Sequence, residues 1–193
     1  MEDESAMIKK YNGIYLSIIM RYKDYIEEHE GLYIADLPKL VTPADSSVAS
    51  VASGIMNSFP SYTYERDFLE AARLAYLYIK EKITAVSLPI QFWQKPSETI
   101  TNCAGDPFDM AVLLCSILVA LGNVSTKIII TLSDGKRDFL VYSEYNEELI
   151  VIDLERGITK AQSREELLSR LKIGTDPELS AYEFNDKMYT NII

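Results

Sequence analysis

The first half of the chain carries its apolar residues at helical spacing. Within residues 6 to 30, one apolar stripe recurs every three or four positions, at Ile8, Tyr11, Tyr15, Ile18, Tyr22 and Ile26. This spacing predicts a single amphipathic helix. Similar stripes predict a second helix that starts at Thr42-Pro43, with Thr42 as its cap, and ends near Phe59-Pro60, and a third helix over residues 64 to 83. We therefore expect a helical N-terminal half.

The run from Met110 to Leu121 differs from these stripes because it is apolar on almost all sides. It is too short to cross a bilayer, which takes about 20 residues, and it therefore predicts a buried helix over residues 107 to 122. The preceding residues, 84 to 105, show no period and predict a long irregular segment.

After residue 125 the pattern changes from helices to strands. Runs of β-branched and alternating residues predict three antiparallel strands, at 126–132, 139–145 and 149–154. The turns between them are predicted at Asp134-Gly135 and Asn146-Glu147. A capping box at Ser163–Glu166 predicts a short helix that ends near residue 172, and the last twenty residues show no period and are expected to dock as a tail.

Composition and charge narrow the classes of function. The chain has 193 residues, of which 48% are hydrophobic and 25% charged, and its net charge is -10. A net acidic chain without a basic cluster argues against binding to nucleic acid and against attraction to anionic lipid. The acidic N-terminus lacks the basic region of a signal peptide, and two cysteines make no disulfide framework, so we expect a cytoplasmic protein.

Residues 93 to 122 carry a more specific pattern. They run Trp93-Gln94-Lys95-Pro96-Ser97-Glu98-Thr99-Ile100, then Gly105-Asp106-Pro107-Phe108-Asp109, and end with Leu118-Val119-Ala120-Leu121-Gly122. This segment resembles the transglutaminase-like superfamily, which shares the papain-like cysteine protease fold. Members show a Trp, a Pro and Glu-Thr-Leu before Gly-Asp-Cys-x-Asp, which opens a helix ending in Leu-x-x-Leu-Gly. The resemblance extends over residues of about 65 to 155.

The resemblance implies an α+β fold in which a central helix packs on an antiparallel sheet. It places a transglutaminase-like core at residues 61–175. The remaining chain then forms an N-terminal helical extension at 1–60 and a C-terminal tail at 176–193.

The resemblance also implies a catalytic Cys at the start of the helix, a His on a following strand and an Asp on the next strand. In the ungapped alignment, Pro107 takes the place of the Cys. With Asp153 matched to the Asp, the His position falls at Asp138 or Phe139. The single histidine of the chain, His29, lies in the N-terminal helix instead. These remnant positions predict a domain without the family's chemistry.

The residues themselves agree with this interpretation. Asp106 is predicted as the helix cap, Pro107 as the first helical residue and Asp109 as a carboxylate near the free N–H groups. Cys103 is a candidate nucleophile if the loop returns it to the helix start, and a loop or packing cysteine otherwise. Cys115 lies inside the apolar helix, where we expect it to be buried.

The same alignment predicts a binding cleft lined by Trp93, Asp106, Asp109, Asp138 and Asp153. If the four aspartates converge, they can bind a hard cation, or one carboxylate can raise the pKa of another by repulsion. Alternatively, they serve only as helix caps and as solvated residues at strand ends. Trp93 either walls the cleft or fills a gap in the core. We assign no cofactor and no metal-ligand set.

The sequence thus predicts a non-catalytic transglutaminase-like domain that acts as a protein- or peptide-interaction module. The alternatives are an active cysteine hydrolase or acyltransferase that uses Cys103, and a carboxylate-lined cation site. The N-terminal helix and the apolar ending predict contact with a partner protein or a second copy, and that ending comprises Tyr182, Phe184, Tyr189, Ile192 and Ile193. Neither nucleic acid nor a membrane is expected as a partner.

Overall fold

The architecture is a six-stranded antiparallel sheet flanked by helices. The computed structural model describes residues 2–29, 34–90, 92–134, 136–174 and 176–192. The strands are β3 (Lys127–Ser133), β4 (Lys136–Tyr145), β5 (Glu148–Asp153), β6 (Gly157–Ala161), β7 (Ser180–Phe184) and β8 (Tyr189–Asn191). They lie in the order β6-β5-β4-β3-β7-β8. The predicted α+β class is confirmed.

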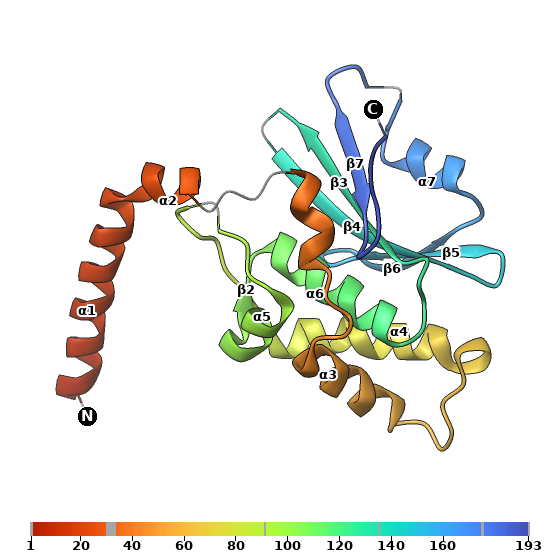
Figure 1. Cartoon of the computed structure of the whole chain (residues 1–193), viewed down its shortest axis with the longest axis horizontal. Coiled ribbons are helices and arrows are strands. Elements are labelled where there is room, and N and C mark those ends of the chain that lie inside the picture. Colours follow the sequence, from red (N-terminus) through yellow and green to blue (C-terminus); the bar gives the residue numbers. More distant parts are fainter. Residues whose placement is uncertain (1, 30–33, 91, 135, 175, 193) are drawn as a thin grey trace.

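Helices make up most of the first two thirds of the chain (Figure 1). They are α1 (Glu2–Arg21), α2 (Lys23–His29), the 3-10 helix η1 (Ile34–Leu40), α3 (Ser46–Met56), α4 (Tyr64–Lys82), α5 (Pro96–Asn102), α6 (Pro107–Ala120) and, after the first strands of the sheet, α7 (Arg164–Arg170). Two short strands, β1 (Thr84–Ala85) and β2 (Ala104–Gly105), form a parallel pair of their own. Among the helices within the described ranges, none is both long enough and apolar enough to span a membrane.

Three sequence expectations for the helices need correction. The N-terminal stripe forms two helices, α1 and α2, instead of one. Helix α3 is capped by Asp45, whose carboxylate accepts the N–H groups of Ser47 and Val48, while the N–H of Thr42 donates to Ser116 Oγ. The segment predicted as irregular, 84–105, contains α5, β1 and β2. The cap of α3 depends on side-chain hydrogen bonds of Asp45, which apolar periodicity does not report.

Two hydrophobic clusters occupy the two faces of the sheet. Alternate side chains of β3 point to opposite faces of the sheet. Ile128 and Ile130 pack with α6, whereas Ile129 packs with Leu167 of α7. Residues of α6 from Phe108 to Leu118 are buried, because the helix lies between the sheet and the layer of α3 and α4. The central helix is therefore the core element that the apolar run predicts.

The sheet extends further than the meander predicted from the sequence. Strand β6 adds a fourth strand to β3, β4 and β5. The last residues, expected as a tail without regular structure, contain β7 and β8, and β7 pairs with β3 from Leu132–Ser180 to Ile128–Phe184. Short, distant strands of this kind gain their order from the partner strand, which local sequence does not reveal. The domain boundaries at residues 60 and 175 stay predictions.

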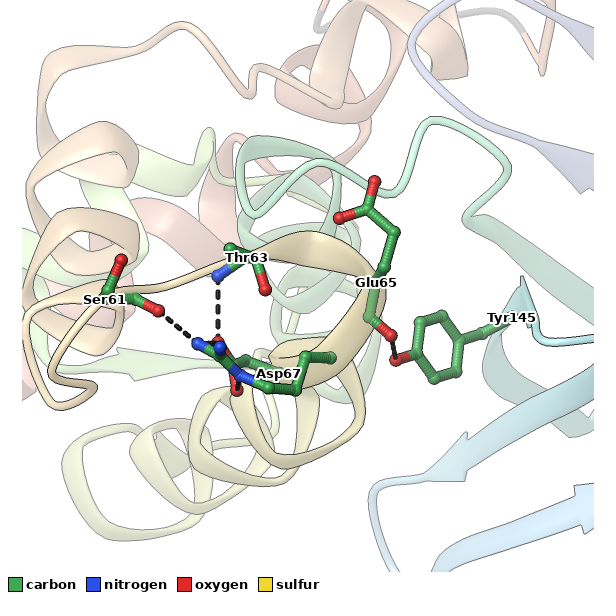
Figure 2. Close-up of polar contacts among 6 residues, drawn as sticks. Ser61, Thr63, Glu65, Asp67 and Tyr145 are labelled. Carbon is green, nitrogen blue, oxygen red and sulfur yellow. Dashed lines mark hydrogen bonds and ion pairs between the residues drawn. The ribbon is translucent and has the colours of Figure 1, made fainter.

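A tyrosine links the sheet to the helical layer. Figure 2 shows Tyr145 of β4 pointing at the start of α4, where its hydroxyl donates to the carbonyl oxygen of Glu65 at 2.6 Å. In the same first turn, Asp67 accepts the N–H of Thr63 at 2.9 Å and pairs with Arg66 at 2.7 Å. Asp67 therefore caps α4 from within the helix, and Tyr145 fixes the helix against β4.

On the other face of the sheet, a buried carboxylate of β7 joins α7 to side chains of β3 and β4. Glu183 of β7 is 3% exposed and accepts the hydroxyl of Tyr142 at 2.9 Å. Its carboxylate also pairs with Arg164 at 3.1 Å and with Lys127 at 3.4 Å. Burial alone would raise the pKa of Glu183, but the hydrogen bonds from Arg164 and Tyr142 and the charge of Lys127 lower it. The folded protein therefore stabilises the charged form of this carboxyl group.

We expect Glu183→Gln to lower the free energy of unfolding by about 2–3 kcal/mol near neutral pH, because it leaves two cations without their buried partner. Since the pKa of Glu183 is lowered from 4.5, this stabilisation is present above that pH and is lost as the pH falls through the folded-state pKa. Urea unfolding at several pH values measures the difference. The control Glu70→Gln, in the exposed Glu70–Arg73 pair, should change stability by less than about 0.5 kcal/mol. If the two variants changed stability equally, the charged Glu183 carboxylate would not be a stabilising group.

Candidate functional site

The start of α6 is closed by two aspartates on either side of a proline. Asp106 is the N-cap, and its carboxylate accepts the N–H of Asp109 at 2.8 Å. Asp109 returns the contact by accepting the N–H of Asp106 at 3.0 Å. Pro107 occupies the first helical position, where it has no N–H to leave unpaired. The predicted helix start is confirmed, and the side chain at the family's Cys position is a proline ring.

Asp109 is a buried group that holds the start of α6 in place. It is 1% exposed and accepts the N–H of Gln94 at 2.9 Å and the Gln94 side-chain amide at 3.2 Å. Gln94 in turn donates to the carbonyl oxygen of Ala104 and accepts from Asn102. Asp109 thus ties the loop after Trp93 to the helix start.

A close approach at Gly105 completes this packing. A Cβ atom at Gly105 would lie 3.0 Å from the Cβ of Asp109 and 3.0 Å from the Cγ2 of Thr99. Backbone and side chain therefore meet here at a distance that only glycine tolerates without a shift of its neighbours. This requirement gives the Gly-Asp pair of the sequence motif a structural reason.

Burial dominates the electrostatics of the two aspartates. Desolvation and the nearby Asp106 carboxylate raise the pKa of Asp109 to about 6, against the hydrogen bonds that it accepts. Desolvation also raises the pKa of Asp106, although Arg137 opposes the shift. Each of the two carboxyl groups nevertheless accepts a backbone N–H at the start of α6.

A hollow of about 540 Å³, which we call the apolar groove, lies beside this helix start. Aromatic rings form its wall, with the ring of Phe108 lying 5.2 Å from Trp93 and 5.5 Å from Phe139. Other lining side chains are Leu37, Leu88, Pro89, Ile90, Ile130, Leu132 and Tyr182, and its charged lining residues are Lys23, Glu27, Asp106 and Arg137. Trp93 therefore both packs on the core and lines an open hollow.

A second hollow of about 440 Å³, the edge depression, lies where β5 ends beside β4. Pro107, Asp138 and Asp153 all line it, together with Phe139. The three positions that the resemblance assigns to Cys, His and Asp are therefore neighbours around one hollow. Asp153 makes a turn there, since its carboxylate accepts the N–H groups of Glu155 and Arg156.

The predicted cluster of four carboxylates does not converge on one point. Strand alternation explains this, because Asp138 shares the side of Leu140 and Tyr142, which pack towards α7, whereas Asp106 and Asp109 belong to α6 on the opposite face. Among the described residues, no group of three His, Cys, Asp or Glu side chains is placed to hold a metal ion. The structure lends the cation-site alternative no support.

The two cysteines lie apart from both hollows. Cys103 is the exposed residue that ends α5, with a left-handed backbone (φ 50°), and its thiol donates to the carbonyl oxygen of Ile100. It lines neither the apolar groove nor the edge depression. Cys115 is fully buried as expected, and burial strongly raises the pKa of its thiol. His29 ends α2, and its side chain lies outside the described part of the structure.

Sequence reasoning missed several residues of the site. Gln94, which anchors Asp109, and Arg137, which lies at the rim of both hollows, carry no motif signal of their own. The alternation of inward and outward side chains along β3 and β4 could have predicted part of the groove wall, since Ile130, Leu132 and Phe139 share one face of the sheet. Tyr182 depends on β7, which the sequence did not predict.

No protein family profile matches this sequence, and no curated protein sequence matches it. Among solved structures, EGTA-treated LapG from Legionella pneumophila superimposes with a TM-score of 0.52 at 17% identity, covering 83% of this chain and 86% of LapG. A second Legionella pneumophila LapG structure gives a TM-score of 0.49 at 16% identity, covering 83% of this chain and 88% of LapG. A putative cysteine protease from Cytophaga hutchinsonii gives 0.47 at 14% identity, covering 83% of this chain and 54% of that protein.

EGTA-treated LapG has the transglutaminase-like, papain-like fold, and the chain has this fold as well. The fold that the resemblance implies is therefore confirmed. Sequence identities of 14–17% support a shared fold but no shared activity. The activity therefore has to be argued from the residues at the start of α6.

We expect the stability contributed by Asp109 to fall as the pH rises. Its folded-state pKa of about 6 exceeds the ordinary value of 3.8, so its contribution is fully present below pH 3.8 and is lost as the pH rises through about 6. The variant Asp109→Asn removes this titration, although it also loses an acceptor.

Between pH 4 and pH 7, the free energy of unfolding measured in urea should fall by about 2–3 kcal/mol more for wild type than for Asp109→Asn. Carbon NMR of the carboxyl group should give a titration midpoint near 6. A midpoint near 4, with parallel stability curves, would show that the group is not desolvated.

Proposed function

We propose that this chain is a non-catalytic transglutaminase-like domain that binds a protein or peptide partner beside the start of α6. The observation that carries the proposal is Pro107 in the first turn of α6, with Asp106 and Asp109 occupying its N–H groups. A thiol enzyme of this fold needs a nucleophile at that turn, and a proline ring cannot attack a carbonyl. Phe139, on the strand position next to Asp138, contacts Phe108 and supplies no base.

The apolar groove provides the binding chemistry. Its wall of Trp93, Phe108 and Phe139 offers aromatic surface to one large apolar side chain, and charged residues on its margin can orient the neighbouring backbone. Binding pockets of this composition take most of their affinity from an apolar anchor. We therefore expect a peptide that inserts an aromatic or large aliphatic residue.

The proposal extends to the surroundings of the protein. Two free thiols, one of them exposed at Cys103, support a reducing compartment such as the cytoplasm. The net charge of -10 supports a protein or peptide as the partner in preference to nucleic acid.

Selection from a phage-displayed library of random 12-residue peptides tests the groove. We expect the selected peptides to be enriched in aromatic and large aliphatic residues and to change the fluorescence of Trp93, the only tryptophan of the chain. Leu132→Lys places a charge in the groove and should weaken binding at least tenfold, corresponding to about 1.4 kcal/mol.

The matched control is Leu69→Lys, at a leucine of α4 that is 38% exposed and outside the groove. Circular dichroism establishes that both variants fold. Peptides that bind Leu132→Lys and Leu69→Lys equally well, or a selection without any enrichment, would contradict the groove as the binding site.

The active-enzyme alternative rests on Cys103, which is exposed. We expect its alkylation by iodoacetamide at neutral pH, followed by mass spectrometry, to be no faster than that of a cysteine in an unstructured peptide. The reason is that Cys103 stands at the C-terminal end of α5, where the helix dipole disfavours a thiolate. Cys115, which is buried, serves as the internal control and should react only after unfolding. Alkylation of Cys103 at ten or more times the peptide rate would favour the enzyme.

A further inference from the structure

Helix α1 holds large apolar side chains in solvent along most of its length. Figure 1 shows it projecting away from the rest of the chain. Along one side, exposed fractions are 52% for Ile8, 51% for Tyr11, 61% for Tyr15, 47% for Ile18 and 54% for Tyr22. Contiguous apolar surface of this kind is uncommon on a monomeric protein and marks an interaction surface.

The spacing of these side chains specifies the kind of partner. Within α1, Ile8, Tyr11, Tyr15 and Ile18 follow one another at intervals of three, four and three residues. This is the a/d pattern of a heptad, whose period of 3.5 keeps the stripe facing another helix. Lys9, Lys10 and Ser17 lie off this stripe. A 20-residue helix without such a partner is only marginally stable in water, so its apolar stripe needs cover.

We propose that α1 packs against α1 of a second copy of this chain, with the two helices antiparallel. An isologous pair is favoured because a heptad stripe is complementary to itself under two-fold symmetry. In one antiparallel register, Ile8 meets Ile18 of the other copy and Tyr11 meets Tyr15.

Charge selects this orientation over the parallel one. The register that aligns the apolar layers also places residue 5 of one copy opposite Arg21 of the other, so the acidic sequence Glu2-Asp3-Glu4 at the start of α1 lies beside the basic end of α1 of the other copy. A parallel pair would instead set the two acidic sequences side by side, where like charges repel. The proposal is independent of the apolar groove and of the peptide that we expect there.

Sedimentation equilibrium over roughly 1–200 µM tests the proposal, a range that covers ordinary homodimer affinities. We expect wild type to reach twice the chain mass of 21.9 kDa. Ile18→Glu should stay monomeric and raise the dissociation constant at least 100-fold. The matched control, Leu16→Glu, changes a side chain of equal exposure, 49% against 47%, that lies off the stripe, and it should dimerise as wild type does.

Orientation is measured with a nitroxide attached at Met20→Cys in a Cys103→Ser background. Met20 lies off the stripe, and in the antiparallel register it faces residue 6 of the other copy, so two labels should be more than about 20 Å apart along the axis. A monomer at 200 µM, an equal loss of dimer in Leu16→Glu and Ile18→Glu, or labels closer than about 15 Å would each overturn the proposal.

Discussion

The reciprocal capping of α6 by Asp106 and Asp109 is the interaction on which the site depends. The first turn of any helix has N–H groups without partners inside the helix, and here both aspartates accept from each other's backbone. Pro107 is exposed and Asp106 half-buried, but Asp109 is buried, so its carboxylate bonds to protein N–H groups. The positive end of the helix dipole at this turn would favour a thiolate. The family motif carries both aspartates beside its Cys, so this cap is the part of the motif that the chain keeps, and Pro107 is the residue that departs from it.

Gln94 and Gly105 show how far this constraint reaches. The Gln94 N–H and side-chain amide both donate to Asp109, which holds the loop that carries Trp93 over the helix start. Gly105 lets that carboxylate approach the backbone. A buried carboxyl group at this position has a raised pKa, and the cost of its charged form is offset by three donors. The aromatic wall of the apolar groove thus has its position fixed by a polar contact beneath it.

The sequence predicts those elements that depend on residues close together in the chain, and it misses those that depend on specific hydrogen bonds or on distant strands. The Asp106-Pro107 start of α6 and the buried run behind it are local signals, and both are confirmed. The cap of α3 at Asp45 and the helix α5 were missed because apolar periodicity does not report specific hydrogen bonds. Strand β7 was missed because its order comes from pairing with β3, some fifty residues away in sequence. Within the site, Asp138 and Asp106 were expected together, yet strand alternation puts them on opposite faces.

Aromatic ring contacts next to Pro107 connect the proposed loss of chemistry to the binding that we propose for the apolar groove. Phe139 packs on Phe108 at 5.5 Å, and Phe108 packs on Trp93 at 5.2 Å, so aromatic rings continue from the strand to the loop. A cysteine at residue 107 would still lack a base, and an imidazole at 139 would have to leave this stack or be buried in it, where burial disfavours its charged form. Return to catalysis thus needs at least two coordinated changes, one at residue 107 and one at residue 138 or 139, and at 139 it also costs aromatic packing. Binding of an apolar side chain needs none of these changes, because the surface that receives it is the one that already stabilises the fold.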